Sequence, residues 1–179
     1  MIDLAVVLPP AYLTSYTLHH GFSSTLSYQL LAFLNATTVI GRGLPGFIAD
    51  RWGRFNVMIV SSVISTIMIL SLWMFAENNL AILVTFTVFF GTFSGTAYSL
   101  TPVCIAQICE QENYATRYGT AYGLVSFATL IGNPLAGAIL GPEKNYKALV
   151  GLCGTAYGTS AVLFVLARGK GGGWKLTVF

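Results

Sequence analysis

Arg42 has the clearest chemical potential in this chain, because it places a charged side chain inside a long apolar stretch. A guanidinium group is a planar fork of N–H donors that can bind a carboxylate through two parallel hydrogen bonds. On a helix, Asn35, Thr38 and Arg42 would follow one another at i, i+3 and i+7 and form a polar stripe that faces the bundle interior. An ionisable residue within a membrane helix costs several kcal/mol and is a functional hypothesis by default. We interpret these three residues as a binding site for an anionic substrate.

A second interpretation of Arg42 is open. Along a helix it would lie about 12 Å from Asp50, at a rise of 1.5 Å per residue. From that depth a long arginine side chain can extend toward the cytoplasmic lipid headgroups, a behaviour known as snorkelling. The sequence therefore leaves Arg42 with either a binding role or an anchoring role.

The stretch from Gly46 to Arg54 suggests a mechanical role, because it concentrates charges between two apolar runs. Gly46 would permit a close approach of helices and Gly53 a tight reversal of the chain. Asp50 can face a helix N-terminus, and Arg51 and Arg54 can anchor at the headgroups. The alternative is an ordinary positively charged loop.

Composition indicates what positions these residues. Hydrophobic residues make up 55% of the chain and charged residues only 8%, whereas soluble domains carry roughly 25% charged residues. A bilayer core about 30 Å thick requires roughly 20 apolar residues of helix. The run 55–76 is almost continuously apolar, which excludes the alternating pattern of a membrane β-barrel. The sequence therefore predicts an all-α, polytopic membrane protein.

We predict a bundle of six transmembrane helices joined by short connections. Breaker residues and polar clusters separate the apolar runs. The expected spans are residues 2–18, 26–48, 55–76, 80–100 with an extension to 108, 121–140 and 148–167, followed by a C-terminal tail at 169–179.

The distribution of Lys and Arg predicts the orientation of the bundle, since short positive loops stay in the cytoplasm. With six spans both termini share one side, and that side collects Arg51, Arg54, Arg117, Arg168, Lys170 and Lys175, against Lys144 and Lys147 opposite. We therefore expect both termini and the Asp50 loop to be cytoplasmic, most simply in a plasma membrane. The net charge of +3 expresses this bias, and no basic cluster with interleaved aromatics suggests nucleic-acid binding.

An enzyme is not expected. The run from Gly41 to Gly46 spells Gly-x-Gly-x-x-Gly, but no strand precedes it and Pro45 lies inside it, which argues against dinucleotide binding. The three cysteines lack metal-ligand spacing, and no His, Cys or carboxylate cluster lies within the spans. We therefore predict no cofactor and no metal.

The pattern Gly46-x-x-x-Asp50-Arg51-x-Gly53-Arg54 resembles the cytoplasmic loop signature of the major facilitator superfamily. The wider run 35–57 looks like the region of helices eight and nine in fungal monocarboxylate-transporter-like proteins. Residues 117–123 and 130–140 resemble helix eleven of that group, and residues 173–176 resemble its C-terminal tail. The resemblance covers nearly the whole chain.

This resemblance implies that the chain is helices seven to twelve of a twelve-helix carrier, built as two inverted three-helix repeats. It implies a small organic anion, such as a monocarboxylate, as the substrate, moved by alternating access between this bundle and a missing N-terminal half. Animal monocarboxylate carriers have an acidic residue one turn before the arginine, where this chain has Thr38. Proton coupling is therefore not carried over. The alternatives are a truncated, non-transporting membrane protein and a facilitator for a different solute.

Overall fold

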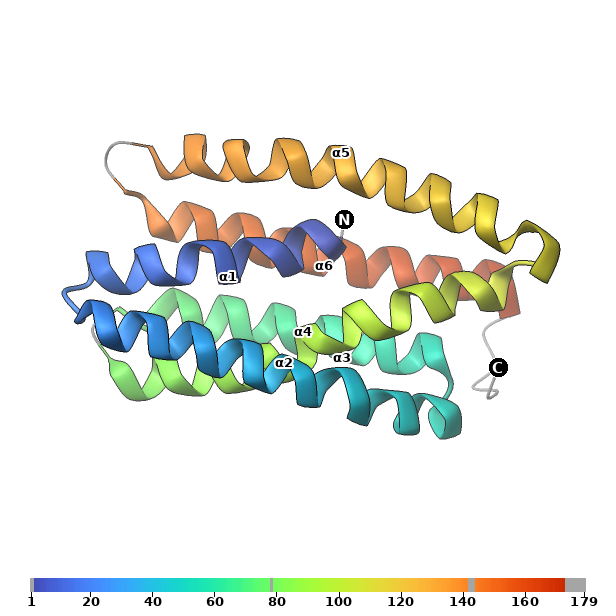
Figure 1. The fold of residues 1–179 in the computed structure, drawn as a ribbon, viewed down its shortest axis with the longest axis horizontal. Coiled ribbons are helices and arrows are strands. Elements are labelled where there is room, and N and C mark those ends of the chain that lie inside the picture. Colours follow the sequence, from blue (N-terminus) through green and yellow to red (C-terminus); the bar gives the residue numbers. More distant parts are fainter. Residues whose placement is uncertain (1, 78, 142–143, 173–179) are drawn as a thin grey trace.

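The computed structural model describes residues 2–77, 79–141 and 144–172, which form an up-and-down bundle of α-helices (Figure 1). The all-helical prediction is confirmed. The elements are α1 (Ile2–His19), α2 (Ser24–Trp52), α3 (Arg54–Met68) with a π-helical end at Ile69–Trp73, α4 (Leu80–Ile108), a 3₁₀ turn at Gln111–Asn113, α5 (Tyr114–Leu140) and α6 (Tyr146–Gly172).

Five of these helices are long and apolar enough to cross a membrane. They are Ser24–Trp52, Arg54–Trp73, Leu80–Gln107, Gln111–Leu140 and Tyr146–Gly169. The shorter α1 is not among the five, so a sixth crossing stays a prediction. The helix α4 continues to Ile108, and the candidate span within it ends at Gln107. The helix α6 continues to Gly172, into the first residues of the expected tail at 169–179, and residues 173–179 lie outside the described part of the chain.

Side-chain caps start three of the helices where the sequence places short polar residues. Ser23 Oγ accepts a hydrogen bond from the Leu26 amide at 3.3 Å at the start of α2. Asn79 Oδ1 caps α4 through the Ala81 amide at 3.0 Å, and Asn145 Oδ1 caps α6 through the Ala148 amide at 3.2 Å. Such caps satisfy amide groups that have no partner within the helix.

The core of the bundle contains a column of aromatic rings shared by α3, α4 and α6. Trp73 stacks on Phe86, and Phe86 on Phe90, with ring centroids 5.2 Å apart in both pairs. The edge of Tyr157 continues the column at 5.9 Å from Phe90. All four rings are fully buried, so α4 runs through the middle of the packed core.

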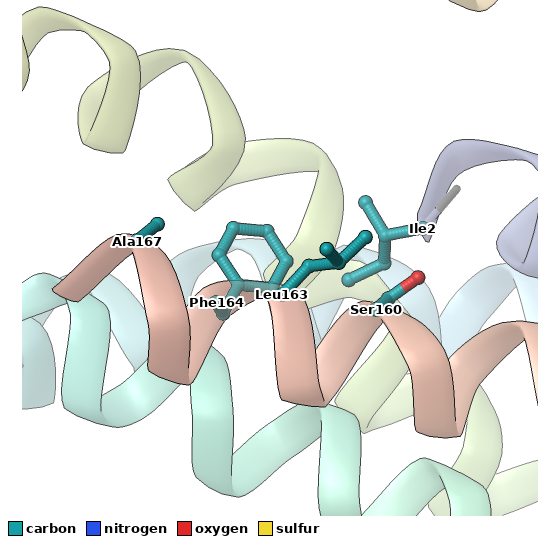
Figure 2. A pocket seen from close by; sticks show the side chains of 5 residues that line it. All are labelled: Ile2, Ser160, Leu163, Phe164 and Ala167. Carbon is teal, nitrogen blue, oxygen red and sulfur yellow. The ribbon is translucent and has the colours of Figure 1, made fainter. Parts of the chain in front are cut away.

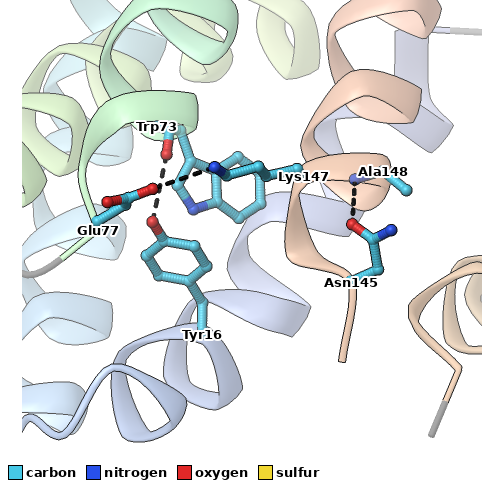
Figure 3. Close-up of polar contacts among 6 residues, drawn as sticks. All are labelled: Tyr16, Trp73, Glu77, Asn145, Lys147 and Ala148. Atoms are coloured by element: carbon cyan, nitrogen blue, oxygen red, sulfur yellow. Dashed lines mark hydrogen bonds and ion pairs between the residues drawn. The ribbon is translucent and has the colours of Figure 1, made fainter. Parts of the chain in front are cut away.

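Polar contacts join helices at the end of the bundle where α1 ends (Figure 3). The Tyr16 hydroxyl donates to the Trp73 carbonyl at 3.4 Å, which ties α1 to the end of α3. Lys147 at the start of α6 forms an ion pair with Glu77 at 3.2 Å. The ends of α1 and α3 and the start of α6 are therefore held together.

The helix α5 lies along one side of the bundle and is loosely packed (Figure 1). Only Gly132 and Ala136 of its described residues are buried. Its outward face exposes large apolar side chains, namely Leu124, Phe127, Leu130, Ile131 and Leu135. One hydrogen bond, from the Tyr12 hydroxyl to the Asn133 carbonyl at 2.9 Å, links it to α1.

Candidate functional site

The site is built on the crossing of α2 and α4, where three glycines bring the helices into backbone contact. A methyl group added at Gly41 would collide with the Thr92 backbone. One added at Gly95 would meet the α2 backbone at Thr38 and Gly41, and one at Gly91 would meet the side chain of Thr37. Because only glycine fits, the flanking side chains of the two helices emerge next to one another.

Arg42 and Tyr98 are the flanking pair. Arg42 directly follows Gly41, Tyr98 lies three residues after Gly95, and the guanidinium carbon lies 4.9 Å from the centre of the Tyr98 ring. A cation over an aromatic face is stabilised by about 0.5 to 2 kcal/mol, more as water is removed. The pair therefore presents a positioned guanidinium on an exposed face of the bundle.

The structure separates the predicted stripe into two faces. Asn35 is exposed like Arg42, whereas Thr38 is 7% exposed and its hydroxyl donates to the Leu34 carbonyl at 2.8 Å. At 100° per residue, Arg42 lies about 20° from Asn35 around the helix, and Thr38 lies about 60° from Asn35 and about 40° from Arg42. That rotation turns Thr38 toward α4. Asn35 and Arg42 are thus exposed in this bundle instead of facing its interior as expected, and the part of Thr38 in a substrate site stays a prediction.

The charged stretch from Gly46 to Arg54 contains the turn between α2 and α3. Gly53 alone interrupts the helices, with φ of 88°, and its amide donates to the Ala49 carbonyl at 2.9 Å. The predicted reversal at Gly53 is confirmed, but the connection is shorter than the expected loop because Asp50 and Arg51 stay in α2 and Arg54 starts α3. Asp50 pairs with Arg54 at 3.8 Å.

Two expectations for this turn have different outcomes. Arg51 is exposed, as an anchoring side chain would be. Gly46 was expected to allow a close helix approach, but a methyl group there would meet nothing within 4 Å. Within the described residues of α2, a methyl group added at Gly41 would instead collide with the Thr92 backbone.

Tyr98 is the member of the pair that the sequence did not assign to the site. It lies on α4, far from Arg42 along the chain. The two residues come together through the packing of α2 against α4, which a single sequence does not show.

An apolar groove of about 240 Å³ lies between the start of α1 and α6 (Figure 2). It is lined by Ile2, Ser160, Leu163, Phe164 and Ala167. Its lining side chains carry no charge, so it offers no group to bind an anion. The described residues also contain no group of three His, Cys, Asp or Glu side chains able to hold a metal ion.

Comparison with known families gives the wider context of this geometry. The family model of the Major Facilitator Superfamily matches residues 2–176, almost the entire chain. The chain belongs to the major facilitator superfamily. It is accordingly an integral, multi-pass membrane protein of a transporter family, and the expectation that it is not an enzyme is confirmed.

The curated relatives of this facilitator chain are fungal. It is 34% identical to the riboflavin transporter MCH5 of Saccharomyces cerevisiae, over 99% of this chain and 34% of that protein. It is 36% identical to an MFS-type transporter of Gibberella moniliformis, over 93% of this chain and 40% of the relative. It is 34% identical to the MFS-type transporter opdF of Penicillium oxalicum, over 96% of this chain and 41% of that relative. The chain therefore spans little more than a third of the length of its relatives.

Proposed function

We propose that this facilitator chain is one six-helix bundle of a carrier for small organic anions, monocarboxylates among them. In this proposal Arg42 binds the carboxylate of the solute, and Asn35 contributes a polar group on the same face. The observation that carries the proposal is the stacking of Arg42 on Tyr98, at 4.9 Å, on an exposed face. It supports binding over snorkelling, since the guanidinium is held on the neighbouring helix.

The depth of the pair strengthens the argument. The helix α2 has 29 residues, which corresponds to a length of about 43 Å. Arg42 precedes its last residue, Trp52, by about 15 Å at 1.5 Å per residue. With a hydrocarbon core about 30 Å thick centred on the bundle, Arg42 lies within the core. A charge there is expensive unless it has a partner, and among the described residues it forms no ion pair.

The proposed partner protein is a complementary bundle that supplies the rest of a full-length carrier. In this arrangement the chain corresponds to helices seven to twelve of a monocarboxylate-transporter-like protein, with two inverted three-helix repeats. The exposed apolar residues of α5 supply surface for such a bundle or for lipid. Rocking of the two bundles about the Arg42 level would give alternating access. We further propose a plasma membrane location, with both termini and the Gly53 turn in the cytoplasm.

The test is anion uptake by the assembled carrier. This chain is co-expressed in vesicles with the complementary half of a fungal relative, and uptake of radiolabelled monocarboxylates is measured. Loss of a bidentate, charge-assisted pair is worth about 1.5 to 3 kcal/mol, so Arg42→Ala is expected to reduce carboxylate affinity roughly 10- to 100-fold. Arg51→Ala, at the exposed turn, is the matched control and is expected to change affinity little.

Two outcomes would contradict the proposal. An unchanged carboxylate affinity in Arg42→Ala would remove the proposed role of this residue. An assembled carrier that reaches the membrane and takes up no anion would favour the alternative, a non-transporting membrane protein.

A second candidate function is a facilitator for a different small solute. The name of the riboflavin transporter relative favours it, together with the aromatic surface that Tyr98 adds to the site. Riboflavin uptake in the same vesicles distinguishes the two. Uptake of riboflavin but not of carboxylates would support this second candidate.

A further inference from the structure

The two histidines of the chain, His19 and His20, lie next to one another where α1 ends. Their ring centres are 5.2 Å apart, and the ring planes are inclined by 76°. His19 is exposed and His20 is half-buried, so water reaches both side chains. This end of the bundle is the one away from the Gly53 turn (Figure 1). The pair therefore offers two accessible imidazole rings outside the predicted spans.

A hydrogen bond determines which nitrogen of His20 is available to a ligand. Its Nδ1 lies 3.0 Å from the carbonyl oxygen of Tyr16. A carbonyl oxygen only accepts, so Nδ1 carries the proton, and the neutral ring keeps its lone pair on Nε2. Metal-binding histidines generally have this arrangement, in which one nitrogen donates to a carbonyl or carboxylate and the other binds the metal. His20 thus presents Nε2 as a metal ligand.

A buried tyrosine supports each of the two rings. The His20 ring lies against that of Tyr16, with ring centres 4.3 Å apart and planes inclined by 31°. Tyr16 is buried, and its hydroxyl donates to a backbone carbonyl at the end of α3. The His19 ring packs against Tyr146 of α6 at 5.0 Å, and the hydroxyl of this buried tyrosine lies 2.7 Å from Ser15 Oγ. Packing of this kind holds a pair of ligands in position before anything binds.

The spacing of the two rings fits one shared metal ion. An ion bound by two imidazole nitrogens at about 2.1 Å, with a tetrahedral angle between them, places the ring centres about 5 Å apart. The observed separation is 5.2 Å. The Glu77 carboxylate at this end of the bundle is paired with Lys147 at 3.2 Å. No third His, Cys, Asp or Glu among the described residues completes a group with the pair, so water would occupy the other coordination positions.

We propose that His19 and His20 form a binding site for one divalent transition-metal ion of the zinc class, held by two imidazole nitrogens and open to water. Imidazole suits Zn²⁺, Cu²⁺ and Ni²⁺, whereas Mg²⁺ and Ca²⁺ prefer oxygen ligands. The sequence predicted no metal because the spans and the cysteines lack a ligand cluster; this pair lies outside the spans. Its support by Tyr146 arises only when α6 packs beside α1. The site is independent of Arg42 and of the proposed solute.

Zinc binding to the purified chain tests this site. The chain is prepared in nanodiscs without a histidine tag, so that these two imidazoles are the only ones present. Isothermal titration with ZnCl₂, at slightly alkaline pH where an ordinary imidazole is neutral, is expected to give one ion per chain. Nitrogen-15 NMR is expected to show shifted imidazole resonances of both histidines. Titration with MgCl₂ is expected to change neither measurement.

The decisive variants remove one imidazole at a time. His19→Ala and His20→Ala are each expected to raise the Kd for Zn²⁺ at least about tenfold, because a single imidazole no longer chelates the ion. Cys109→Ser, which removes a thiol that is not fully buried, and Glu77→Gln are the matched controls and should preserve the Kd. Circular dichroism verifies that each variant is helical, and His19→Ala, at an exposed position, decides the test if His20→Ala does not fold.

Four results would overturn the inference. They are the absence of saturable Zn²⁺ binding, imidazole resonances that do not move, an unchanged Kd in His19→Ala, and a loss of binding in Cys109→Ser or Glu77→Gln as large as that in the histidine variants. The last result would assign the ion to a thiol or a carboxylate instead of the imidazole pair.

Discussion

The crossing of α2 and α4 and the helix α5 use the same small-residue spacing for different purposes. In Gly91-x-x-x-Gly95 both glycines are buried against α2, and a methyl group at either would meet atoms of that helix. In Gly119-x-x-x-Gly123 both glycines are exposed, and a methyl group would meet nothing within 4 Å. A motif that predicts close packing therefore predicts neither the partner nor whether the partner belongs to the same chain.

This difference bears on where a binding site can be built. Arg42 and Tyr98 emerge from the tight crossing, so their relative position is fixed by backbone contact. A site on a rigid pair of helices keeps its geometry better than one on a mobile element. The weakly held α5 is better suited to accommodate a second bundle, in agreement with the proposed carrier.

The largest effect is expected from Gly41→Ala. Its methyl group would collide with the Thr92 backbone, which cannot move aside as a flexible side chain can. Overpacking of this kind costs about 1 to 3 kcal/mol. We expect the free energy of unfolding in mixed detergent micelles to fall by that amount. A variant as stable as the unmodified chain would show that the α2–α4 crossing is not close-packed.

An intermediate effect is expected from Tyr12→Phe. This change removes the hydrogen bond from the Tyr12 hydroxyl to the Asn133 carbonyl of α5. A typical hydrogen bond contributes about 0.5 to 1.5 kcal/mol, and less where water can replace it. Hydrogen exchange is expected to accelerate in α5 and to stay unchanged in α2 and α4. Uniform acceleration in all three helices would contradict a loosely attached α5.

A smaller effect is expected from Gly132→Ala. The added methyl group meets the Leu4 side chain, whose flexible end can rotate away, rather than a backbone. We therefore expect a loss below about 1 kcal/mol, smaller than for Gly41→Ala, in the same unfolding assay. An equal loss at both positions would mean that α1 holds α5 as rigidly as α4 holds α2.

The sequence predicted the helices well, because a long apolar run has few structures other than an α-helix available to it in a bilayer. It placed their ends less well, since α2 and α3 include Asp50, Arg51 and Arg54, which the sequence assigned to a loop. Charged residues are compatible with helix in water, and only the backbone of Gly53 forces the break. A hydropathy pattern reports the limits of the lipid core, not those of the helix.

The candidate site was predictable only in part. Arg42 stood out as a charge in an apolar run, and the helical period placed Asn35 on its face. Thr38 is buried beside the neighbouring helix, which the helical period alone did not indicate, and its part in the site stays a prediction. Tyr98 joins the site through packing between helices, which one sequence without its relatives does not encode visibly.

The smallest effect on stability is expected from Gly123→Ala. This variant is therefore the control for Gly41→Ala, which makes the same substitution at a close-packed position. The position is exposed and helical, and the added methyl group has open space. Alanine favours helix over glycine by about 1 kcal/mol at most, so stability should stay the same or rise slightly. If Gly123→Ala instead destabilised the chain by as much as Gly41→Ala, the open face of α5 would already be occupied, for example by a second copy of the chain. Unfolding measured at several protein concentrations would reveal such self-association, because a paired α5 makes stability depend on concentration.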